Sequence, residues 1–363
     1  MPAASFVSDS TALERLTEQL HAASAFALDT EFMRERTYYP QLCLVQLAGP
    51  DLVACIDPLA IEDLEPLDAL LGQSAAIKVV HAVRQDLEAL LTRITTPPTR
   101  LFDTQVAAAL IGLSPQVGYG DLVQRFCGVA LDKTHARTDW AARPLAPAQL
   151  RYASDDVRYL LPLRDALIGE LERHGRVAWF EAEMLRHASA GTRRIDPDEA
   201  WQRLKGLDGL DARRRETAKR LARWREERAI SRNRPRGWIL SDDALYEIVR
   251  QLPEDRAALE RVAAAPRGLI EKSGDALLSI VKSTAQLDAT PRVRPGERPD
   301  PEQQKRLKHL AATVRRVAEH LDLSPELLAT RRDLQQLLTG NRDIEPLRGW
   351  RREVIGEVLL KAL

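Results

Sequence analysis

FALDTEF, at residues 26–32, is the stretch that decides the fold of the N-terminal part of the chain. Its first three residues are apolar, as in a strand that enters a hydrophobic core. Asp29 and Glu31 then place two carboxylates in the same strand. Alternate residues of a strand point to one face, so Asp29 and Glu31 project together and Thr30 projects to the other face. Two buried carboxylates repel each other, so one of them is expected to stay protonated unless a cation compensates the pair.

The compensating cation could come from the chain or from solution. Arg34 and Arg36 follow closely in the sequence, so a salt bridge is one solution. A hard divalent metal is the other, because Mg²⁺ prefers oxygen ligands and is usually held by a few carboxylates and a substrate phosphate. The pair of carboxylates alone leaves both interpretations open.

Composition narrows the class of protein. With 363 residues, of which 44% are hydrophobic, the chain is expected to form two or three globular domains. No apolar run approaches the roughly 20 residues of a membrane span, and the N-terminus lacks the pattern of a secretory signal. Cys43, Cys55 and Cys127 form no CxxC pair, which argues against zinc and indicates small core residues in a reducing compartment. These features predict a cytoplasmic protein without a membrane partner.

The formal net charge of zero conceals two halves of opposite sign. Residues 1–190 contain 17 Lys and Arg against 25 Asp and Glu, whereas residues 191–363 contain 36 against 28. An acidic half can hold divalent cations, and a basic half can hold a polyanion. Two solvated surfaces of opposite sign would explain the same numbers.

Hydrophobic periodicity predicts an α/β domain over residues 1–190. Short apolar runs rich in β-branched residues predict strands at 25–29, 43–48, 52–56 and 77–81. Amphipathic patterns predict helices at 10–20, 63–71, 84–93, 104–112, 118–127 and 147–173. Three early strands, then a helix and a fourth strand, indicate a mixed sheet flanked by helices. Ser10 and Asp103 are suitable N-cap residues for two of these helices.

The strand pattern ends near residue 190, and the rest of the chain is predicted to be helical. Residues 191–287 are expected to form a first small helical domain. One predicted helix begins near Pro197, a long one covers 211–229 and another follows Ser241. Two more are predicted at 254–264 and 273–284. The sequence DATPRVRPGERPDPE is rich in proline, so residues 288–301 are predicted to be a linker. Residues 302–363 are expected to form a second helical domain.

A further acidic position follows a later strand. Asp86 lies in the first turns of a predicted helix, just after the strand at 77–81. In open α/β sheets, sites form outside the carboxyl ends of such strands. An acid at a helix start also interacts favourably with the helix dipole, so Asp86 alone is compatible with a purely structural role.

The helix predicted at 147–173 carries the last motif. Tyr152 and Asp156 are four residues apart and therefore share one face of this helix, whereas Asp155 faces a different direction. A tyrosine in the core beside a solvated acid would give the same pattern. The order of these motifs along the chain is more specific than any one of them.

Taken in that order, the motifs resemble the DEDD family of 3′→5′ exonucleases, in the subgroup with a tyrosine in its last motif. The stretches that carry the resemblance are FALDTEFMRERTYYPQLCLVQLA, VVHAVRQDLEALL, FDTQVAAALIG and LDKTHARTDWAARPLAPAQLRYASDDVRYL. The helical domains resemble HRDC modules, which are nucleic-acid-binding units. The first does so through LARWREERAISRNRPRGWILSDDALYEIVRQLP, and the second more weakly through RRDLQQLLTG and PLRGWRREVIGEVLL. The resemblance implies a ribonuclease H-like exonuclease domain followed by two all-α HRDC-like domains.

The resemblance also implies a metal-dependent hydrolase that shortens nucleic acids from the 3′ end. Its implied catalytic residues are Asp29, Glu31, Asp86, Tyr152 and Asp156. The four carboxylates would hold two divalent metal ions, Mg²⁺ or Mn²⁺. The family pattern Y-A-x-x-D-V assigns the last ligand to Asp156, in agreement with the helical spacing. Tyr152 would position the attacking water, because an ordinary tyrosine pKa near 10 makes it a poor base at neutral pH.

The substrate that the resemblance implies is RNA, above all precursor tRNA, with release of nucleoside 5′-monophosphates. A 3′→5′ DNA exonuclease and a non-catalytic RNA-binding protein are the alternatives. The chain contains no G-x-x-x-x-G-K-[ST] motif of a helicase and no polymerase-sized region, which speaks against a DNA enzyme of those kinds. A scaffold would be expected to lack one of the carboxylates, and all are present. The sequence indicates no obligate protein partner and is compatible with a monomer.

Basic residues concentrate in the helix predicted at 211–229. They are Arg213, Arg214, Arg215, Lys219, Arg220, Arg223, Arg225 and Arg228. Since they cannot all share one face of a helix, some of them only solvate it. The functional interpretation is salt-sensitive binding of an RNA backbone, with the individual RNA-binding residues unidentified. Trp201, Trp224 and Trp238 are predicted to pack in the cores of the small helical domains.

Overall fold

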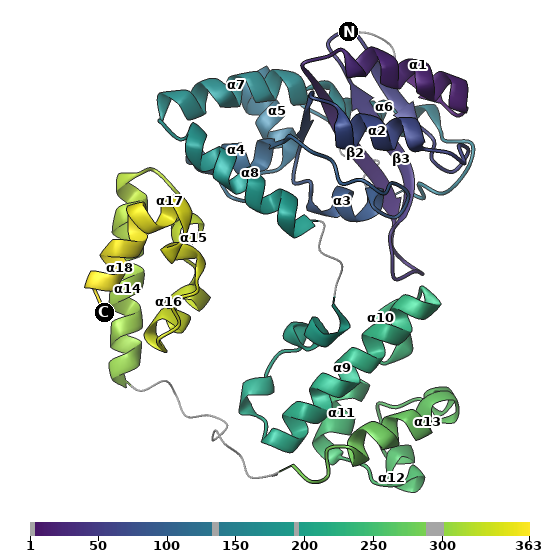
Figure 1. Ribbon diagram of the computed structural model, residues 1–363, viewed down its shortest axis with the longest axis vertical. Helices are drawn as coiled ribbons and strands as arrows, with labels where there is room; N and C mark the ends of the chain where they lie inside the picture. The colour runs from purple at the N-terminus through teal and green to yellow at the C-terminus, as the bar shows by residue number, and fades with distance from the viewer. Residues whose placement is uncertain (1–3, 133–137, 192–195, 288–300) are drawn as a thin grey trace. The chain divides into compact units, whose positions relative to one another are not determined.

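The computed structural model describes residues 4–132, 138–191, 196–287 and 301–363 (Figure 1). Residues 288–300 of the predicted linker, and residues 133–137 within the last motif stretch, lie outside the described residues. The chain divides into two compact units. The first unit contains residues 1–33, 40–193 and 299–363, and the second contains residues 34–39 and 194–298.

A six-stranded mixed sheet lies at the centre of the first unit. Its strands are β1 (Ser5–Val7), β2 (Ala25–Met33), β3 (Gln41–Ala48), β4 (Val53–Ile56), β5 (Ile77–Val80) and β6 (Leu101–Asp103). The order is β1-β4-β3-β2-β5-β6, with β2, β3 and β4 antiparallel and the other neighbours parallel. The sequence predicted the four inner strands, whereas β1 and β6 are only three residues long and give no alternating pattern.

Helices pack against both faces of the sheet. They are α1 (Ser10–His21), α2 (Glu65–Gln73), α3 (Arg84–Leu90), α4 (Thr104–Leu110), α5 (Tyr119–Cys127), α6 (Pro147–Arg158), α7 (Leu160–Arg173) and α8 (Val177–Gly191). The long helix predicted at 147–173 is divided at Tyr159, and α8 was not predicted. The predicted cap of α1 was also wrong, because the side chain of Asp9, not Ser10, accepts the N–H of Ala12 at 2.9 Å. Asp103 caps α4 as predicted.

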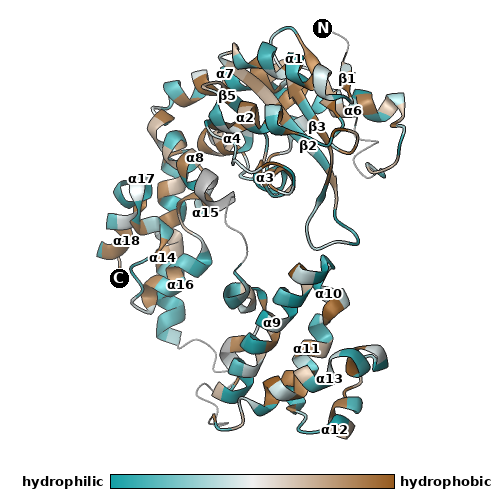
Figure 2. Cartoon of the chain, turned by 45° about the vertical axis from the view of Figure 1, so that its right-hand side comes forward, coloured by the Kyte–Doolittle hydropathy of each residue, from teal (hydrophilic) through white to brown (hydrophobic). Residues whose placement is uncertain are grey.

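Strand β2 separates two hydrophobic cores. Phe26 and Leu28 pack with α1, α2 and α3 on one face of the sheet. Ala27 belongs to the core on the other face, which contains residues of α4, α5, α7 and α8. Because side chains alternate along a strand, Asp29 continues the face of Ala27 and Thr30 continues the face of Phe26. Figure 2 shows hydrophobic residues concentrated in the strands, while the helices have one hydrophobic and one hydrophilic side.

The helices of the second unit form their own core. They are the 3₁₀ helices η1 (Pro197–Arg203) and η2 (Leu207–Gly209), and α9 (Ala212–Arg232), α10 (Arg236–Ile239), α11 (Asp242–Gln251), α12 (Arg256–Glu260) and α13 (Arg267–Lys282). Trp201 and Trp224 are partly buried against this core. The prediction for Trp238 was wrong: its side chain is 61% exposed, because α10 is one turn long and buries only Ile239. Helix α13 also begins earlier than predicted.

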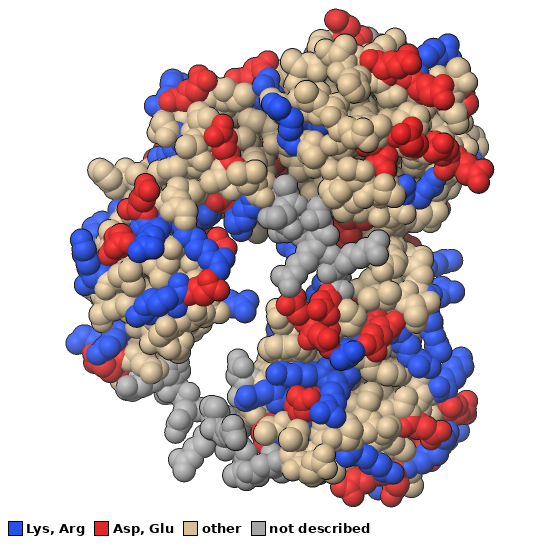
Figure 3. Space-filling model, viewed as in Figure 1, with Lys and Arg blue, Asp and Glu red and all other residues tan. Residues whose placement is uncertain are grey.

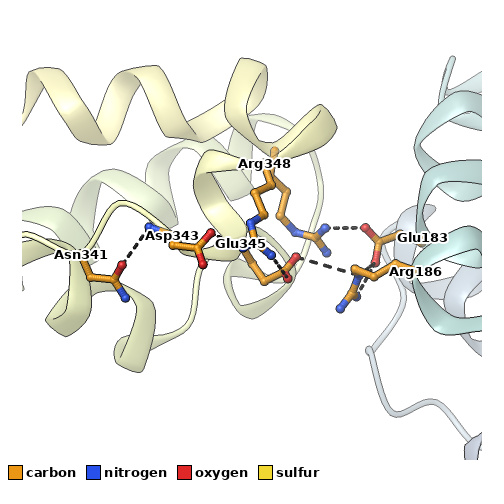
Figure 4. A network of polar contacts seen from close by, with 7 residues as sticks. Glu183, Arg186, Asn341, Asp343, Glu345 and Arg348 are labelled. Atoms are coloured by element: carbon orange, nitrogen blue, oxygen red, sulfur yellow. Dashed lines mark hydrogen bonds and ion pairs between the residues drawn. The ribbon is translucent and has the colours of Figure 1, made fainter. Parts of the chain in front are cut away.

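The C-terminal helices of the first unit share a core with α4, α5, α7 and α8. They are α14 (Pro301–His320), α15 (Pro325–Leu328), α16 (Arg331–Leu338), η3 (Glu345–Leu347), α17 (Gly349–Arg351), the π-helical turn η4 (Arg352–Gly356) and α18 (Glu357–Lys361). The rings of Trp179 and Trp350 stack with centroids 4.4 Å apart. Figure 4 shows Glu183 and Arg186 of α8 facing polar side chains of these C-terminal helices. No helix in the described part of the chain is long and apolar enough to cross a membrane.

Candidate active site

The carboxylates of β2 lie on the sheet face that α6 covers. Helix α6 packs on β2, β3 and β4, and both Asp29 and Glu31 are half-buried beneath it. Gln46 of β3 stands directly opposite Asp29 in the antiparallel register, so its side chain shares that face. The Gln46 amide is fully buried and has no hydrogen-bond partner in the described part of the chain. Sequence reasoning missed Gln46, because its place beside Asp29 depends on strand register.

Asp86 reaches the same region from the first turn of α3. Its Oδ1 accepts a hydrogen bond of 2.5 Å from the Thr30 hydroxyl, which projects from the opposite face of β2. Thr30 is buried, so this bond fixes the start of α3 against the edge of the strand. The residue between the two strand carboxylates therefore has a role of its own: it orients a third carboxylate.

Tyr152 and Asp156 lie on the face of α6 that is turned to the sheet. The Tyr152 hydroxyl donates a hydrogen bond to the Asp156 carboxylate, and the Tyr152 ring packs against the buried Trp140 with centroids 6.1 Å apart. Asp155 is directed elsewhere and forms an ion pair of 3.0 Å with Arg158. The structure thus brings Asp156, rather than Asp155, together with the carboxylates of β2.

The electrostatic coupling of the four carboxylates shows that they share one site. Burial raises the pKa of Asp29 well above its usual value, and the charges of Asp86, Asp156 and Glu31 raise it further. Burial, together with Asp156 and Asp86, raises the pKa of Glu31 to about 9. Burial also raises the pKa values of Asp86 and Asp156 to about 7, against opposing hydrogen bonds from Thr30 and Tyr152 respectively.

This set of side chains suits a divalent cation. All four candidate ligands are carboxylates, the donors that hard cations such as Mg²⁺ and Mn²⁺ prefer. The charged groups that act most strongly on Asp29 and Glu31 are all acidic, so the structure does not favour the salt-bridge solution. Within the described residues, no three His, Cys, Asp or Glu side chains form a ready-made metal shell.

Asp103 fixes the turn that carries Asp86 into the site. It is 2% exposed, and its two oxygens accept hydrogen bonds from the backbone N–H groups of Ala82 (3.0 Å), Val83 (3.0 Å) and Gln105 (2.9 Å). Ala82 has a left-handed φ of 56°, which is unfavourable for a residue with a side chain. Asp103 was predicted only as a helix cap. Its bonds to the β5–α3 turn join segments that are about 20 residues apart and leave no sequence pattern.

Replacing Asp103 with asparagine is expected to lower kcat by roughly 10- to 100-fold, the usual cost of losing a residue that orients a catalytic ligand. The amide NH₂ would face a backbone N–H, so the turn before Asp86 would shift. Asp68→Asn is the matched control, because Asp68 holds the Thr95–Thr96 turn by similar bonds outside the carboxylate cluster. Steady-state kinetics compare the two variants, and equal activity of both would show that Asp103 acts only on stability.

Comparisons with known proteins identify the family. A model of the 3′-5′ exonuclease family matches residues 4–172, an HRDC domain model matches 214–281, and a model of the ribonuclease D C-terminal HRDC domain matches 301–359. Ribonuclease D of Granulibacter bethesdensis is 40% identical over 365 residues, covering 98% of this chain and 91% of that protein. The chain belongs to the ribonuclease D family.

Ribonuclease D from another bacterium resembles this chain both in sequence and in structure. Ribonuclease D of Escherichia coli K12 is 35% identical over 360 residues, covering 96% of this chain and 95% of that protein. The crystal structure of E. coli RNase D, described as an exoribonuclease involved in structured RNA processing, matches with a TM-score of 0.91 and 34% identity, covering 100% of this chain and 99% of that one. The predicted fold class is confirmed, and the chain is a 3′→5′ exoribonuclease that acts on RNA.

Proposed function

We propose that this exoribonuclease trims the 3′ ends of precursor tRNA with two divalent metal ions and releases nucleoside 5′-monophosphates. The observation that supports this proposal is the convergence of four carboxylates, from β2, α3 and α6, around the C-terminal part of strand β2. Ionised carboxylates repel a phosphodiester, so a half-buried site built from four of them needs cations to bring the substrate close.

The chain's own residues have separable roles in this proposal. Asp29, Glu31, Asp86 and Asp156 would hold the cations against the terminal phosphate. When bound, the cations supply Lewis acidity at the phosphate and lower the pKa of the attacking water. Burial raises the pKa of Tyr152 above its ordinary value, and the charge of Asp156 raises it further, so Tyr152 keeps its proton at neutral pH. It can donate a hydrogen bond to the water or to Asp156 but cannot act as a base.

The domain division and the cellular setting are part of the proposal. We assign residues 1–190 to the exonuclease domain, 191–287 to the first HRDC-like domain, 288–301 to a linker and 302–363 to the second HRDC-like domain. The positions of the three family matches support these boundaries. We also propose that the protein acts in the cytoplasm without an obligate protein partner, as a monomer.

A labelled-substrate assay tests the proposed function. A tRNA with several extra 3′ nucleotides, a mature tRNA and a DNA of matched sequence would each carry a 3′-terminal label. The expected result is release of labelled mononucleotide from the extended tRNA, in the presence of Mg²⁺ or Mn²⁺ but not of EDTA. Equal degradation of the DNA would favour the DNA exonuclease, and absence of any turnover with metal would favour the RNA-binding scaffold.

Protons and metal are expected to compete for the carboxylates. Because the pKa of Glu31 is raised to about 9, Glu31 is protonated at neutral pH until a cation displaces the proton. Affinity for Mg²⁺ should therefore rise between about pH 6 and pH 9, by up to about tenfold per pH unit for each proton released. Calorimetry in two buffers of different ionisation enthalpy measures both the affinity and the proton release. Binding that is independent of pH over this range would contradict the assignment of these ligands.

A further inference from the structure

The basic side chains of α9 differ in their partners. Most of the arginines between the start and the middle of α9 form ion pairs. These pairs are Arg214–Asp211 (2.5 Å), Arg220–Glu216 (2.8 Å), Arg223–Glu227 (2.8 Å) and Arg225–Asp242 (2.5 Å). Arg228 and Arg232, toward the C-terminal end, have no acidic partner among the described residues. Figure 3 shows that Lys and Arg side chains over the helical modules mostly alternate with acidic ones. Unpaired positive charge in the described part of α9 thus lies mainly at one end of the helix.

The unpaired arginines line a hollow of about 270 Å³ in the second unit. Lys272 of α13 and Trp238 of α10 are among the other residues that line it, and no acidic side chain is among its described lining residues. The Nε of Arg228 is buried without a hydrogen-bond partner among the described residues, while the guanidinium lies 5.2 Å from the Trp224 ring centroid. A buried cationic nitrogen without an acceptor is costly, which points to an anion that binds in the hollow. The volume is near the lower end for ligand pockets and fits one phosphate or base rather than a large cofactor.

The first turn of α13 provides a further feature of this hollow. Helix α13 starts at Arg267 without a side-chain cap, and Gly268 in its first turn lines the hollow. Nothing lies within 4 Å of the position where a side chain of Gly268 would begin, so its backbone is open to a ligand. The positive end of a 16-residue helix attracts anions, and its free N–H groups can bind phosphate oxygens.

Trp238 adds an aromatic surface to these charges. Its side chain is 61% exposed, and the Arg234 guanidinium lies 5.8 Å from the ring centroid. An exposed tryptophan beside unpaired cations is the combination with which proteins bind single-stranded nucleic acid, through base stacking and backbone contacts. An acidic peptide would use the cations but would have no need of the flat ring.

We propose that this hollow binds one phosphodiester of the RNA substrate, with Arg228, Arg232, Lys272 and the start of α13 around the phosphate and the adjoining base stacked on Trp238. The proposal rests on the RNA-trimming function and adds to it a binding subsite for a single-stranded nucleotide outside the exonuclease domain. Since backbone charge and stacking are independent of sequence, the subsite would increase affinity without selecting a base.

Matched charge variants test this subsite. Arg232→Gln with Lys272→Gln removes two exposed cations of the hollow, and Arg220→Gln with Arg223→Gln removes two exposed but ion-paired cations of α9. Binding of the full-length protein to a tRNA with a single-stranded 3′ extension would be measured by anisotropy in EDTA over a series of salt concentrations. The hollow variant should lose roughly 0.7 units of salt-dependence slope per phosphate contact, whereas the control should keep the wild-type slope. Equal slopes in both variants would overturn the proposal.

Two further variants separate the subsite from folding and from catalysis. Trp238→Ala should weaken binding roughly tenfold through lost stacking. Gly268→Asp should weaken binding by repelling the phosphate while α13 stays folded, since an acid suits a helix N-terminus. Both variants should hydrolyse a dinucleotide with the wild-type kcat/KM. Failure of the wild-type protein to release mononucleotides from the extended tRNA would instead contradict the proposed function. Wild-type RNA affinity of both variants would overturn the subsite and indicate that the hollow serves another ligand, such as an acidic peptide.

Discussion

Asp29→Asn is expected to lower kcat for release of the 3′-terminal nucleotide by at least about 10²-fold, the scale of losing one preorganised group that stabilises charge in the transition state. Asp29 stands at the centre of the carboxylate cluster, since the charges of Asp86, Asp156 and Glu31 all act on it. An amide of the same shape preserves packing but removes the negative ligand. Single-turnover hydrolysis of a 3′-labelled RNA at saturating Mg²⁺ measures the effect.

The same substitution is expected to leave the metal-free protein at least as stable as the wild type. The pKa of Asp29 is raised in the folded state, so its contribution to stability is full below its unfolded pKa and is lost as pH rises through the folded pKa. The substituted amide cannot ionise, so thermal unfolding of the variant in EDTA should depend less on pH above about pH 4, the ordinary pKa of an aspartate. An inactive variant that is also unfolded would leave the catalytic role unsupported, and one with wild-type turnover would exclude it.

Tyr152→Phe provides the comparison for Asp29→Asn. It removes the hydrogen bond that the hydroxyl donates to Asp156, or to the attacking water, but leaves the charge of the site intact. Turnover should fall by roughly tenfold, which corresponds to one hydrogen bond. A loss as large as that of Asp29→Asn would show that the tyrosine hydroxyl takes part in the chemistry itself.

Glu183→Gln is expected to reduce the free energy of unfolding of the first unit by about 3–5 kcal/mol, the usual result of removing one partner of a buried ion pair. Glu183 is 3% exposed and accepts hydrogen bonds from Arg351 and from Trp350 Nε1, the latter at 2.9 Å. It also pairs with Arg186 at 2.6 Å. Glutamine would leave the 7%-exposed Arg351 buried without its counter-charge.

A pair on the surface of the same unit is the control for this measurement. Arg352 and Glu357 form an exposed ion pair of 2.9 Å, so Glu357→Gln should cost no more than about 1 kcal/mol. Urea unfolding at pH 7 compares the two variants. Similar losses in both would mean that the contact between α8 and the C-terminal helices contributes little to stability.

Glu183 also determines how the first unit responds to acid. Burial alone would raise the pKa of Glu183, but the hydrogen bond and charge of Arg351 outweigh it and lower the pKa to about 2. A depressed pKa gives stability that is present above the unfolded value of about 4.3 and is lost as pH falls toward 2. In the glutamine variant this acid-dependent part of the unfolding curve should disappear.

The side chains that share a face within a motif were predictable, because that placement depends on local periodicity. Alternation in β2 places Asp29 and Glu31 on one face, and the four-residue spacing in α6 places Tyr152 with Asp156. The inner strands β2 to β5 are long enough for their apolar pattern to be recognised. Strands β1 and β6 are not, and α8 lies in a stretch whose apolar residues were not recognised as a helix.

The sequence by itself predicted the α/β fold of the first domain and its helical continuation, and its resemblance to the DEDD exonucleases implied the five candidate catalytic residues. Only the tertiary structure showed which residues from other segments lie next to these candidate catalytic residues. Gln46 lies beside Asp29 because of strand register. Asp103 accepts hydrogen bonds from the backbone of the turn before Asp86, although about 20 residues separate the two segments. The hollow beside Trp238 likewise exists only in the folded chain, because its lining residues come from three helices, α9, α10 and α13. Periodicity reports which face a residue occupies, whereas only the folded chain determines which other segment meets that face.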